Sequence, residues 1–305
     1  MKRIFSIFLL LLATKLIYAQ QDPQYTQYMY NMNVLNPAYA GSFEGISIGA
    51  LYRSQWVGLD GAPSTGTFNV HLPIEKNVGI GFSIIKDEIG PVRETNAYVD
   101  FSYTLKLGQE HKFALGIKAG TTFHNIGIWE GQIDIIDAGD PFFAENINEV
   151  SPNIGIGAYF YLPNKYYVSV SIPNMLNSIH LDAAGNKIGS ETQHFFTAAG
   201  YVFNISENFK LKPHVMVKLA FDAPLSFDIN TNVFMYDLVE IGFGYRLDDS
   251  FSGMINFILT PRLRIGYSYD NIRSNLNIVT NSSHEVFINF DIVLPKRVSR
   301  SPRYF

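Results

Sequence analysis

From Gly45 onward, apolar and polar residues alternate over segments that are longer than the strands of most soluble proteins. In one such segment the mostly apolar set is Thr95, Ala97, Val99, Phe101, Tyr103, Leu105 and Leu107. The residues between them, which are mostly polar, are Glu94, Asn96, Tyr98, Asp100, Ser102, Thr104 and Lys106. A period of two residues is that of a β-strand, whereas an amphipathic helix repeats its apolar positions every 3.6 residues. The pattern therefore predicts strands with two chemically different faces.

The alternation predicts fourteen strands, at 45–57, 64–73, 77–86, 93–107, 111–123, 151–162, 166–172, 193–205, 208–220, 225–235, 238–246, 250–259, 262–270 and 284–294. Every second connection is short, and the longest connections, at 124–150, 173–192 and 271–283, all belong to the other set. Short turns on one rim and long loops on the other are typical of outer-membrane barrels, which have periplasmic turns and extracellular loops. We therefore expect an all-β, antiparallel transmembrane β-barrel of about 14 strands, and the even count places both termini in the periplasm.

A secreted β-sandwich or a soluble up-and-down barrel is the alternative, because a sequence does not show which face points inward. Strand length favours the membrane, since a tilted spanning strand needs about 9–11 residues. Composition points the same way: charged residues make up only 16% of the chain, which contains 24 Phe and 18 Tyr. Aromatic residues near strand ends are typical of the interfacial girdles of such barrels.

The ends of the chain divide into shorter segments. Residues 1–19 have the features of a signal peptide: Lys2 and Arg3, an apolar run from Ile4 to Ala13, and a small residue at Ala19. The apolar run is too short for a membrane anchor. We assign residues 20–44 to an N-terminal leader, 45–294 to the barrel and 295–305 to a basic tail. Cleavage would leave 20 basic against 27 acidic residues, which argues against a nucleic-acid partner.

The leader has helix-like spacing of its large residues. These are Tyr25, Tyr28, Met29, Met32 and Leu35, and the sequence Asn36-Pro37 with Gly41 ends the helical pattern. We expect one or two short amphipathic turns, folded into the lumen as a plug or lying along the periplasmic rim. Four glycines on inward positions, Gly79, Gly81, Gly116 and Gly120, either make room for such a segment or relieve strand curvature.

The inward face of the predicted barrel carries charges of both signs. Lys210, Lys212, His214 and Lys218 on one strand neighbour Asp228, Asn230 and Asn232 on the next. Mixed signs favour an internal network of ion pairs over the single-sign constriction of a selective pore.

The sequence contains no motif for catalysis. The seven histidines are scattered, and no zinc-binding, nucleophile-elbow or phosphate-loop pattern occurs. We therefore expect no catalytic residue, no cofactor site and no metal site. An outer-membrane hydrolase stays an alternative only if His124, His180 or His284 lies beside an acid and a serine.

Two stretches of sequence resemble a known family. Asp22-Pro23-Gln24-Tyr25-Thr26-Gln27-Tyr28-Met29, running into Asn36-Pro37-Ala38-Tyr39-Ala40-Gly41-Ser42, resembles the PorP/SprF family, and so does Tyr52 to Pro63 followed by Thr67 to Leu72. The resemblance implies a non-enzymatic outer-membrane component of the type IX secretion system of Bacteroidetes. It also implies contact with a periplasmic ring or a peptidoglycan-binding lipoprotein, and help in the export or surface attachment of large cargo such as adhesins, including those of gliding species. A passive porin or hydrophobic-solute transporter is the alternative.

Eleven residues are candidates for plug or partner contacts: Tyr25, Tyr28, Met29, Asn36, Pro37, Arg53, Trp56, Arg297, Arg300, Arg303 and Phe305. Arg53 and Trp56 could hold the leader against the wall, although Trp56 also suits an interfacial anchor. The basic tail suits a docking peptide for an acidic partner, a displaced insertion signal or a solvated end.

Overall fold

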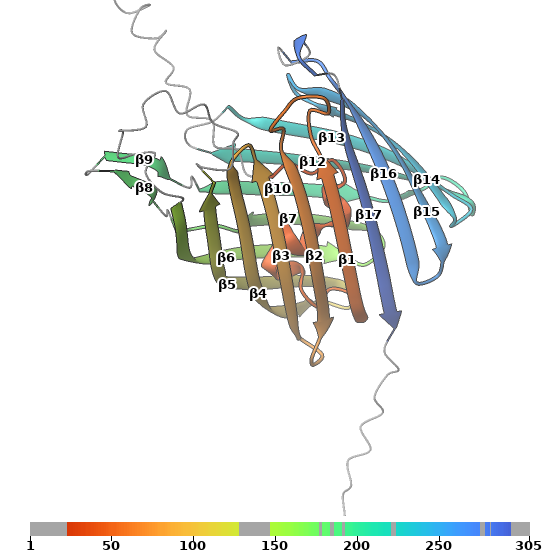
Figure 1. Ribbon diagram of the computed structural model, residues 1–305. Helices are drawn as coiled ribbons and strands as arrows, with labels where there is room; N and C mark the ends of the chain where they lie inside the picture. Colours follow the sequence, from red (N-terminus) through yellow and green to blue (C-terminus); the bar gives the residue numbers. More distant parts are fainter. Residues whose placement is uncertain are drawn as a thin grey trace, which may run out of the picture.

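The computed structural model describes residues 23–127, 147–176, 179–183, 186–190, 193–220, 224–274, 278–280 and 282–293. Its main feature is a ring of antiparallel strands (Figure 1). The first seven are β1 (Gly45–Ser54), β2 (Ser64–Pro73), β3 (Val78–Ile89), β4 (Val92–Leu107), β5 (His111–Ile126), β6 (Ile147–Leu162) and β7 (Tyr166–Ile172). The others are β10 (His194–Tyr201), β11 (Phe203–Asn204), β12 (Phe209–Ala220), β13 (Ser226–Met235), β14 (Val239–Arg246), β15 (Ser250–Thr260), β16 (Leu263–Ile272) and β17 (Ser282–Val293).

Neighbouring strands pair around the whole ring, which is closed. β1 pairs with β17, and β10 pairs with both β7 and β12. β11 continues β10 beyond Val202 and pairs with the same partner, β12. Counting β10 and β11 as one interrupted strand, the barrel has 14 strands. The predicted closed antiparallel barrel of about 14 strands is confirmed.

The apolar face of each strand points outward. On β4, Val99 and Phe101 are 57% and 45% exposed, whereas Asp100 between them is fully buried. A soluble sandwich or soluble barrel would have the opposite arrangement, because its apolar residues form the core. The wall is therefore built to meet lipid on the outside, and its polar residues line the lumen.

A charge on the outer face tests this orientation. Val99→Arg, in the middle of β4, is expected to lower the free energy of unfolding by about 2–4 kcal/mol in lipid vesicles, as measured by urea titration. Leu107→Arg makes a matched control, because Leu107 ends the same strand at its rim and a charge there should cost about 0–1 kcal/mol. Equal costs at the two positions would contradict a membrane-spanning β4.

The two rims differ as the sequence predicts. Short turns join β2 to β3, β4 to β5 and β13 to β14 at one rim, and the turn between β2 and β3 lies at the bottom of Figure 1. In the last of these, Tyr236 and Asp237 have φ of 53° and 52°, as in a two-residue turn that matches the twist of a hairpin. β1 begins and β17 ends at this short-turn rim.

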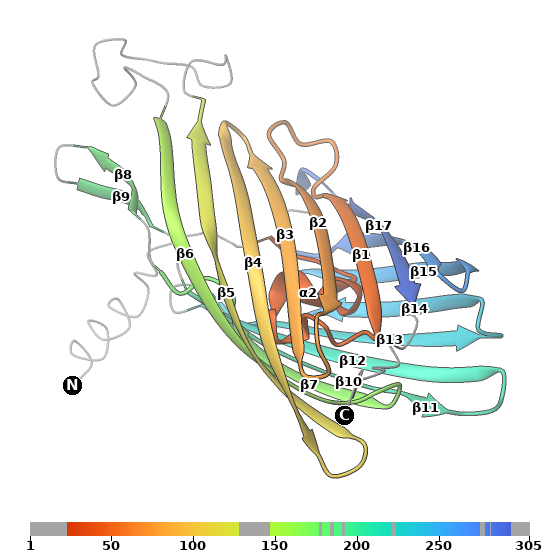
Figure 2. The ribbon, with the colours of Figure 1, turned by 90° about the horizontal axis from the view of Figure 1, so that it is seen from below.

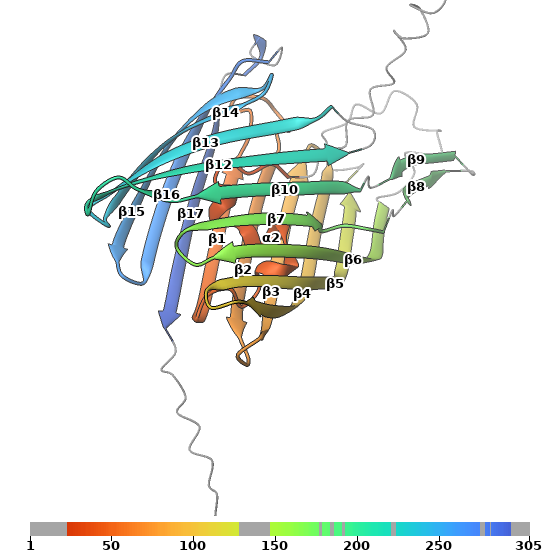
Figure 3. The ribbon, with the colours of Figure 1, turned by 180° about the vertical axis from the view of Figure 1, so that it is seen from behind.

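The opposite rim carries the long connections. One of them contains a separate hairpin, β8 (Ile179–Ala183) and β9 (Asn186–Ser190), which stands away from the barrel in all three views (Figures 1–3). Among the described residues, no helix is long and apolar enough to cross a membrane.

The described part of the leader, residues 23–44, lies inside the ring. It forms three short helical turns, η1 (Tyr28–Tyr30), α2 (Met32–Leu35) and η2 (Pro37–Tyr39). The view from below shows α2 surrounded by strands, and the view from behind agrees (Figures 2 and 3). Tyr25, Tyr28 and Met32 form the apolar centre of the lumen, where each is at most 3% exposed.

Candidate functional site in the barrel lumen

The leader passes through the lumen from one half of the barrel to the other. Thr26 bonds Glu285 and Arg53, which lie near the long-loop ends of β17 and β1. Gly41 bonds His71, which lies near the short-turn end of β2. The barrel's own ends, where β1 begins and β17 ends, thus share the short-turn rim, as the even strand count predicts, whereas the leader begins in the opposite half.

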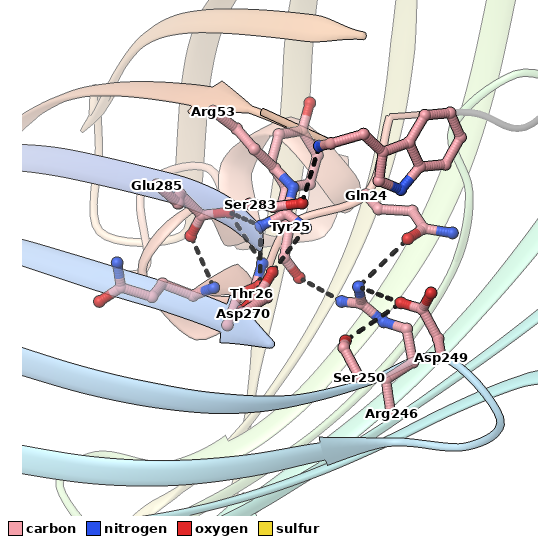
Figure 4. Close-up of polar contacts among 12 residues, drawn as sticks. Gln24, Tyr25, Thr26, Arg53, Arg246, Asp249, Ser250, Asp270, Ser283 and Glu285 are labelled. Carbon is pink, nitrogen blue, oxygen red and sulfur yellow. Dashed lines mark hydrogen bonds and ion pairs between the residues drawn. The ribbon is translucent and has the colours of Figure 1, made fainter. Parts of the chain in front are cut away.

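A buried ion cluster binds the leader at Thr26, near the long-loop rim (Figure 4). The Arg53 guanidinium lies 2.7 Å from Asp270, 3.3 Å from Glu285 and 2.8 Å from the Thr26 hydroxyl. The Thr26 hydroxyl itself donates to Asp270 at 2.8 Å. All three charged side chains are at most 2% exposed, so each depends on the others for compensation.

A second ion pair, between Arg246 and Asp228, engages the first residues of the leader. Arg246 makes two bonds to the Asp228 carboxylate, of 2.8 and 2.9 Å. Its other hydrogens reach the Gln24 side chain at 3.1 Å and the Tyr25 carbonyl at 3.4 Å (Figure 4). A bidentate pair fixes the orientation of the guanidinium and leaves donors free for the leader.

Tyr30 reaches toward the short-turn half of the lumen. Its ring stacks on Phe287 with centroids 4.9 Å apart, and the Arg264 guanidinium lies over it at 4.9 Å. Its hydroxyl donates to Glu240, which also pairs with Lys212 at 2.6 Å. Burial raises the pKa of Tyr30, so the hydroxyl stays protonated and remains a donor.

Three asparagines connect the middle of the leader to the wall. Asn31 accepts from Asn69 at 3.0 Å, and Asn33 donates to Asp100 at 3.4 Å. Asn36 does two things at once: its oxygen caps η2 by accepting from Ala38, and its nitrogen donates to Ser169 at 2.7 Å. The Asn-Pro dipeptide therefore shapes the last turn of the leader and also attaches it to β7.

Glycines on the wall make room for this turn. A Cβ on Gly116 would lie 2.2 Å from the Ala38 nitrogen, and one on Gly79 would lie 2.2 Å from the Ala40 oxygen. A Cβ on Gly157 would lie 2.0 Å from the Asn36 oxygen. Gly79, Gly81 and Gly116 thus accommodate the leader, the first of the two roles considered for them. Gly120 does not, because its neighbours are Ala97 and Tyr98 of the wall.

Filling one of these positions is expected to dislodge the turn. Gly116→Val should increase hydrogen exchange of residues 36–41 by about tenfold or more, because main-chain atoms block the added side chain. Gly66→Val is the matched control, since a Cβ at Gly66 meets nothing within 4 Å. The same exchange rates in both variants would show that the turn does not depend on the glycine.

The remaining candidates from the sequence fall into two groups. Four of them are described. Tyr25, Tyr28 and Met29 are buried in the lumen. Trp56 donates its main-chain N–H to the Ser283 hydroxyl at 3.1 Å. The signal segment and the tail positions Arg297, Arg300, Arg303 and Phe305 lie outside the described residues. Glu285, Arg246, Lys118 and Gly157 were not candidates, and alternation alone identifies them only as inward-facing.

The ion pairs of the lumen extend beyond the two strands considered in the sequence. Lys212 pairs with Glu240, which lies two strands away on β14, and Asp228 pairs with Arg246, which is also on β14. Lys118 lies 3.5 Å from Asp100 on the adjacent strand. Side-chain length explains the Lys212 pair, since lysine reaches across β13, whereas Asp228 and Arg246, like Asp100 and Lys118, lie directly opposite each other on adjacent strands.

The histidines whose side chains the structure describes do not gather at one site. His124 lies 3.5 Å from Glu94 inside the barrel, and His284 bonds Tyr267 at 2.7 Å. The side chain of His180 lies outside the description. In the part of the chain that the structure describes, no three His, Cys, Asp or Glu side chains are grouped as metal ligands would be.

An apolar outer wall, a polar lumen and two unlike rims define an outer-membrane β-barrel, here with its own N-terminal segment inside. The family model for the type IX secretion system membrane protein PorP/SprF matches residues 17–290, and the chain belongs to this family. Its location is accordingly the outer membrane. Among curated proteins, none matches this chain.

Several solved outer-membrane proteins are similar to the barrel. The Acinetobacter baumannii outer membrane protein Omp33 is 11% identical, with 82% of this chain and 98% of that chain covered and a TM-score of 0.46. A Pseudomonas aeruginosa FadL homologue is 9% identical, with coverage of 84% and 92% and a TM-score of 0.49. The P. putida toluene transporter TodX is 9% identical, with coverage of 83% and 90% and a TM-score of 0.45.

Proposed function

We propose that this protein is a non-enzymatic component of type IX secretion that works through contacts with other proteins and does not conduct solutes. The observation that supports this most is the leader in the lumen, which contacts strands on all sides of the ring through buried polar groups. A porin needs an open path for water, whereas here a folded segment occupies that path. The leader therefore acts as a plug.

The proposed partners lie on the two sides of the membrane. At the periplasmic rim, a ring protein or a peptidoglycan-binding lipoprotein meets the short turns, which expose charged residues such as Glu75, Lys76 and Glu110. The basic sequence from Lys296 to Arg303 offers a further contact for an acidic partner. On the outside, the protein assists export or surface attachment of a large secreted protein, such as an adhesin of a gliding species. Signal-peptide cleavage after Ala19 precedes assembly.

The test is to purify the tagged protein from outer membranes in mild detergent and identify what accompanies it by mass spectrometry. We expect secretion-ring proteins, a periplasmic lipoprotein and one large surface protein. A variant with Arg297, Arg300 and Arg303 changed to Ser should lose the periplasmic partner and keep the surface protein. Recovery of the barrel alone, together with ion conductance in planar bilayers, would favour the porin or solute transporter instead.

A further inference from the structure

The wall of the lumen bonds the main chain of the leader at many points. Near the long-loop rim, the two oxygens of Glu285 accept from the successive amides of Thr26 and Gln27, both at 2.8 Å. Asn230 donates to the Thr26 carbonyl at 3.4 Å. A carboxylate that accepts from two neighbouring amides makes charge-assisted bonds, which are stronger than neutral ones.

Further down, the wall again binds main-chain atoms. Lys118 donates to the Val34 carbonyl at 2.9 Å, and Ser171 donates to the Leu35 carbonyl at 2.8 Å. Near the short-turn rim, Ser102 donates to the Ala40 carbonyl at 2.5 Å. These groups come from β4, β5, β7, β13 and β17, so recognition of the main chain extends around the ring.

One large side chain of the leader is not matched by a polar group of the wall. Gln27 is fully buried, yet among the described residues its side-chain amide has no hydrogen-bond partner. A buried amide without a partner is destabilising, so an apolar side chain of similar size should fit better at this position. We therefore expect the wall to accept an apolar side chain in place of Gln27.

The charge pattern also defines what the lumen accepts. Residues 23–43 contain no Asp, Glu, Lys or Arg, whereas the wall around them contributes Arg53, Arg246, Glu285 and Lys118. Wall charges pair with each other and use their remaining donors and acceptors on amides and carbonyls. An acidic residue entering at Gln27 would meet the Glu285 carboxylate in a buried site, at high cost in free energy.

We infer that the lumen is a polypeptide-binding site that reads main-chain amides and carbonyls, and that the leader occupies it as a replaceable ligand. The other ligand is an uncharged segment supplied by a second chain. This inference rests on the proposed function, because a secretion component meets other polypeptides at the membrane. It gives the leader the role of an internal competitor that keeps the site filled until such a segment displaces it.

An exchange experiment on the full chain tests this. A protease site is inserted between Ser42 and Phe43, near the short-turn rim, and the folded protein is cut so that the leader is held only by non-covalent contacts. Fluorescent synthetic peptides of residues 23–42 are then added, and binding is followed by fluorescence anisotropy. Four peptides are compared: the native sequence, Gln27→Met, Gln27→Glu, and one with ester bonds replacing the amides of Thr26 and Gln27.

The native peptide should replace the cut leader, and Gln27→Met should bind at least as tightly. The ester peptide, which keeps every side chain but lacks the two donors to Glu285, should bind roughly a hundredfold more weakly. Gln27→Glu should be weakened by at least as much. No entry of any peptide, or equal binding of native and ester peptides, would overturn the inference. Both results leave the proposed function standing, since co-purification with secretion proteins is a separate measurement.

Discussion

Deletion of residues 23–44 is expected to turn a barrel that passes almost no current into one with discrete open-channel steps. The lumen is lined by polar and charged side chains, and the leader is the segment that fills it in the structure. A barrel of this size without that segment leaves a water-filled path. We expect conductance in planar bilayers to rise by about tenfold or more.

Two controls separate the leader's contacts from its mere presence. A Gly/Ser sequence of equal length in place of residues 23–44 keeps the chain length but has none of the contacts, and it should also conduct. Circular dichroism and heat-dependent gel mobility show whether each variant contains a folded barrel. A folded barrel without the leader that still passes no current would refute the plug.

Removing the guanidinium of Arg53 is expected to be the most destabilising single change in the lumen. Arg53→Met leaves Asp270 and Glu285 buried side by side without a cation between them. Loss of one partner from a buried ion cluster costs about 3–5 kcal/mol, because the remaining charges stay desolvated. We expect this loss in urea unfolding, together with release of the leader to added protease.

The chain offers a matched surface pair as a control. Lys86 lies 2.6 Å from Glu88, but the two side chains are 60% and 38% exposed. Lys86→Met should therefore cost about 0–1 kcal/mol. Neutralising both acids, in Arg53→Met combined with Asp270→Asn and Glu285→Gln, should recover part of the stability. A cost for Arg53→Met no larger than that for Lys86→Met would show that the cluster does not hold the lumen together.

The barrel itself could be predicted from the sequence because the patterns that specify it, alternation and turn length, lie within short stretches of the chain. Alternation fixes which residues of a strand share a face, and turn length fixes which rim a connection belongs to. The segment predicted at 93–107 is observed as Val92–Leu107, and that at 166–172 as Tyr166–Ile172. The observed strand boundaries differ from the predicted ones where residues next to a long loop are also extended. β6, for example, starts at Ile147 instead of 151.

The site was less accessible to prediction because its contacts join distant parts of the chain. Thr26 and Glu285 are separated by 259 positions, and no local pattern connects them. Arg53 was a candidate because it belongs to a recognisable motif, whereas Arg246 occurs in an ordinary strand. The route of the leader was equally hidden, since its spacing predicts short turns but not the half of the barrel in which it begins.

The pairing of β1 with β17 has a consequence for how the protein is assembled. This seam joins Gly45 to Val293, so it forms between the two ends of the barrel sequence, and the leader is continuous with its first strand. The leader, which precedes β1 in the chain, must therefore be inside the curved sheet before the seam closes, or be drawn through a finished ring afterwards. On the first route, contacts of the leader with β4, β5 and β7 can form while the sheet is still open. The leader then serves as a template around which the final strands curl, and closure and docking become one cooperative event.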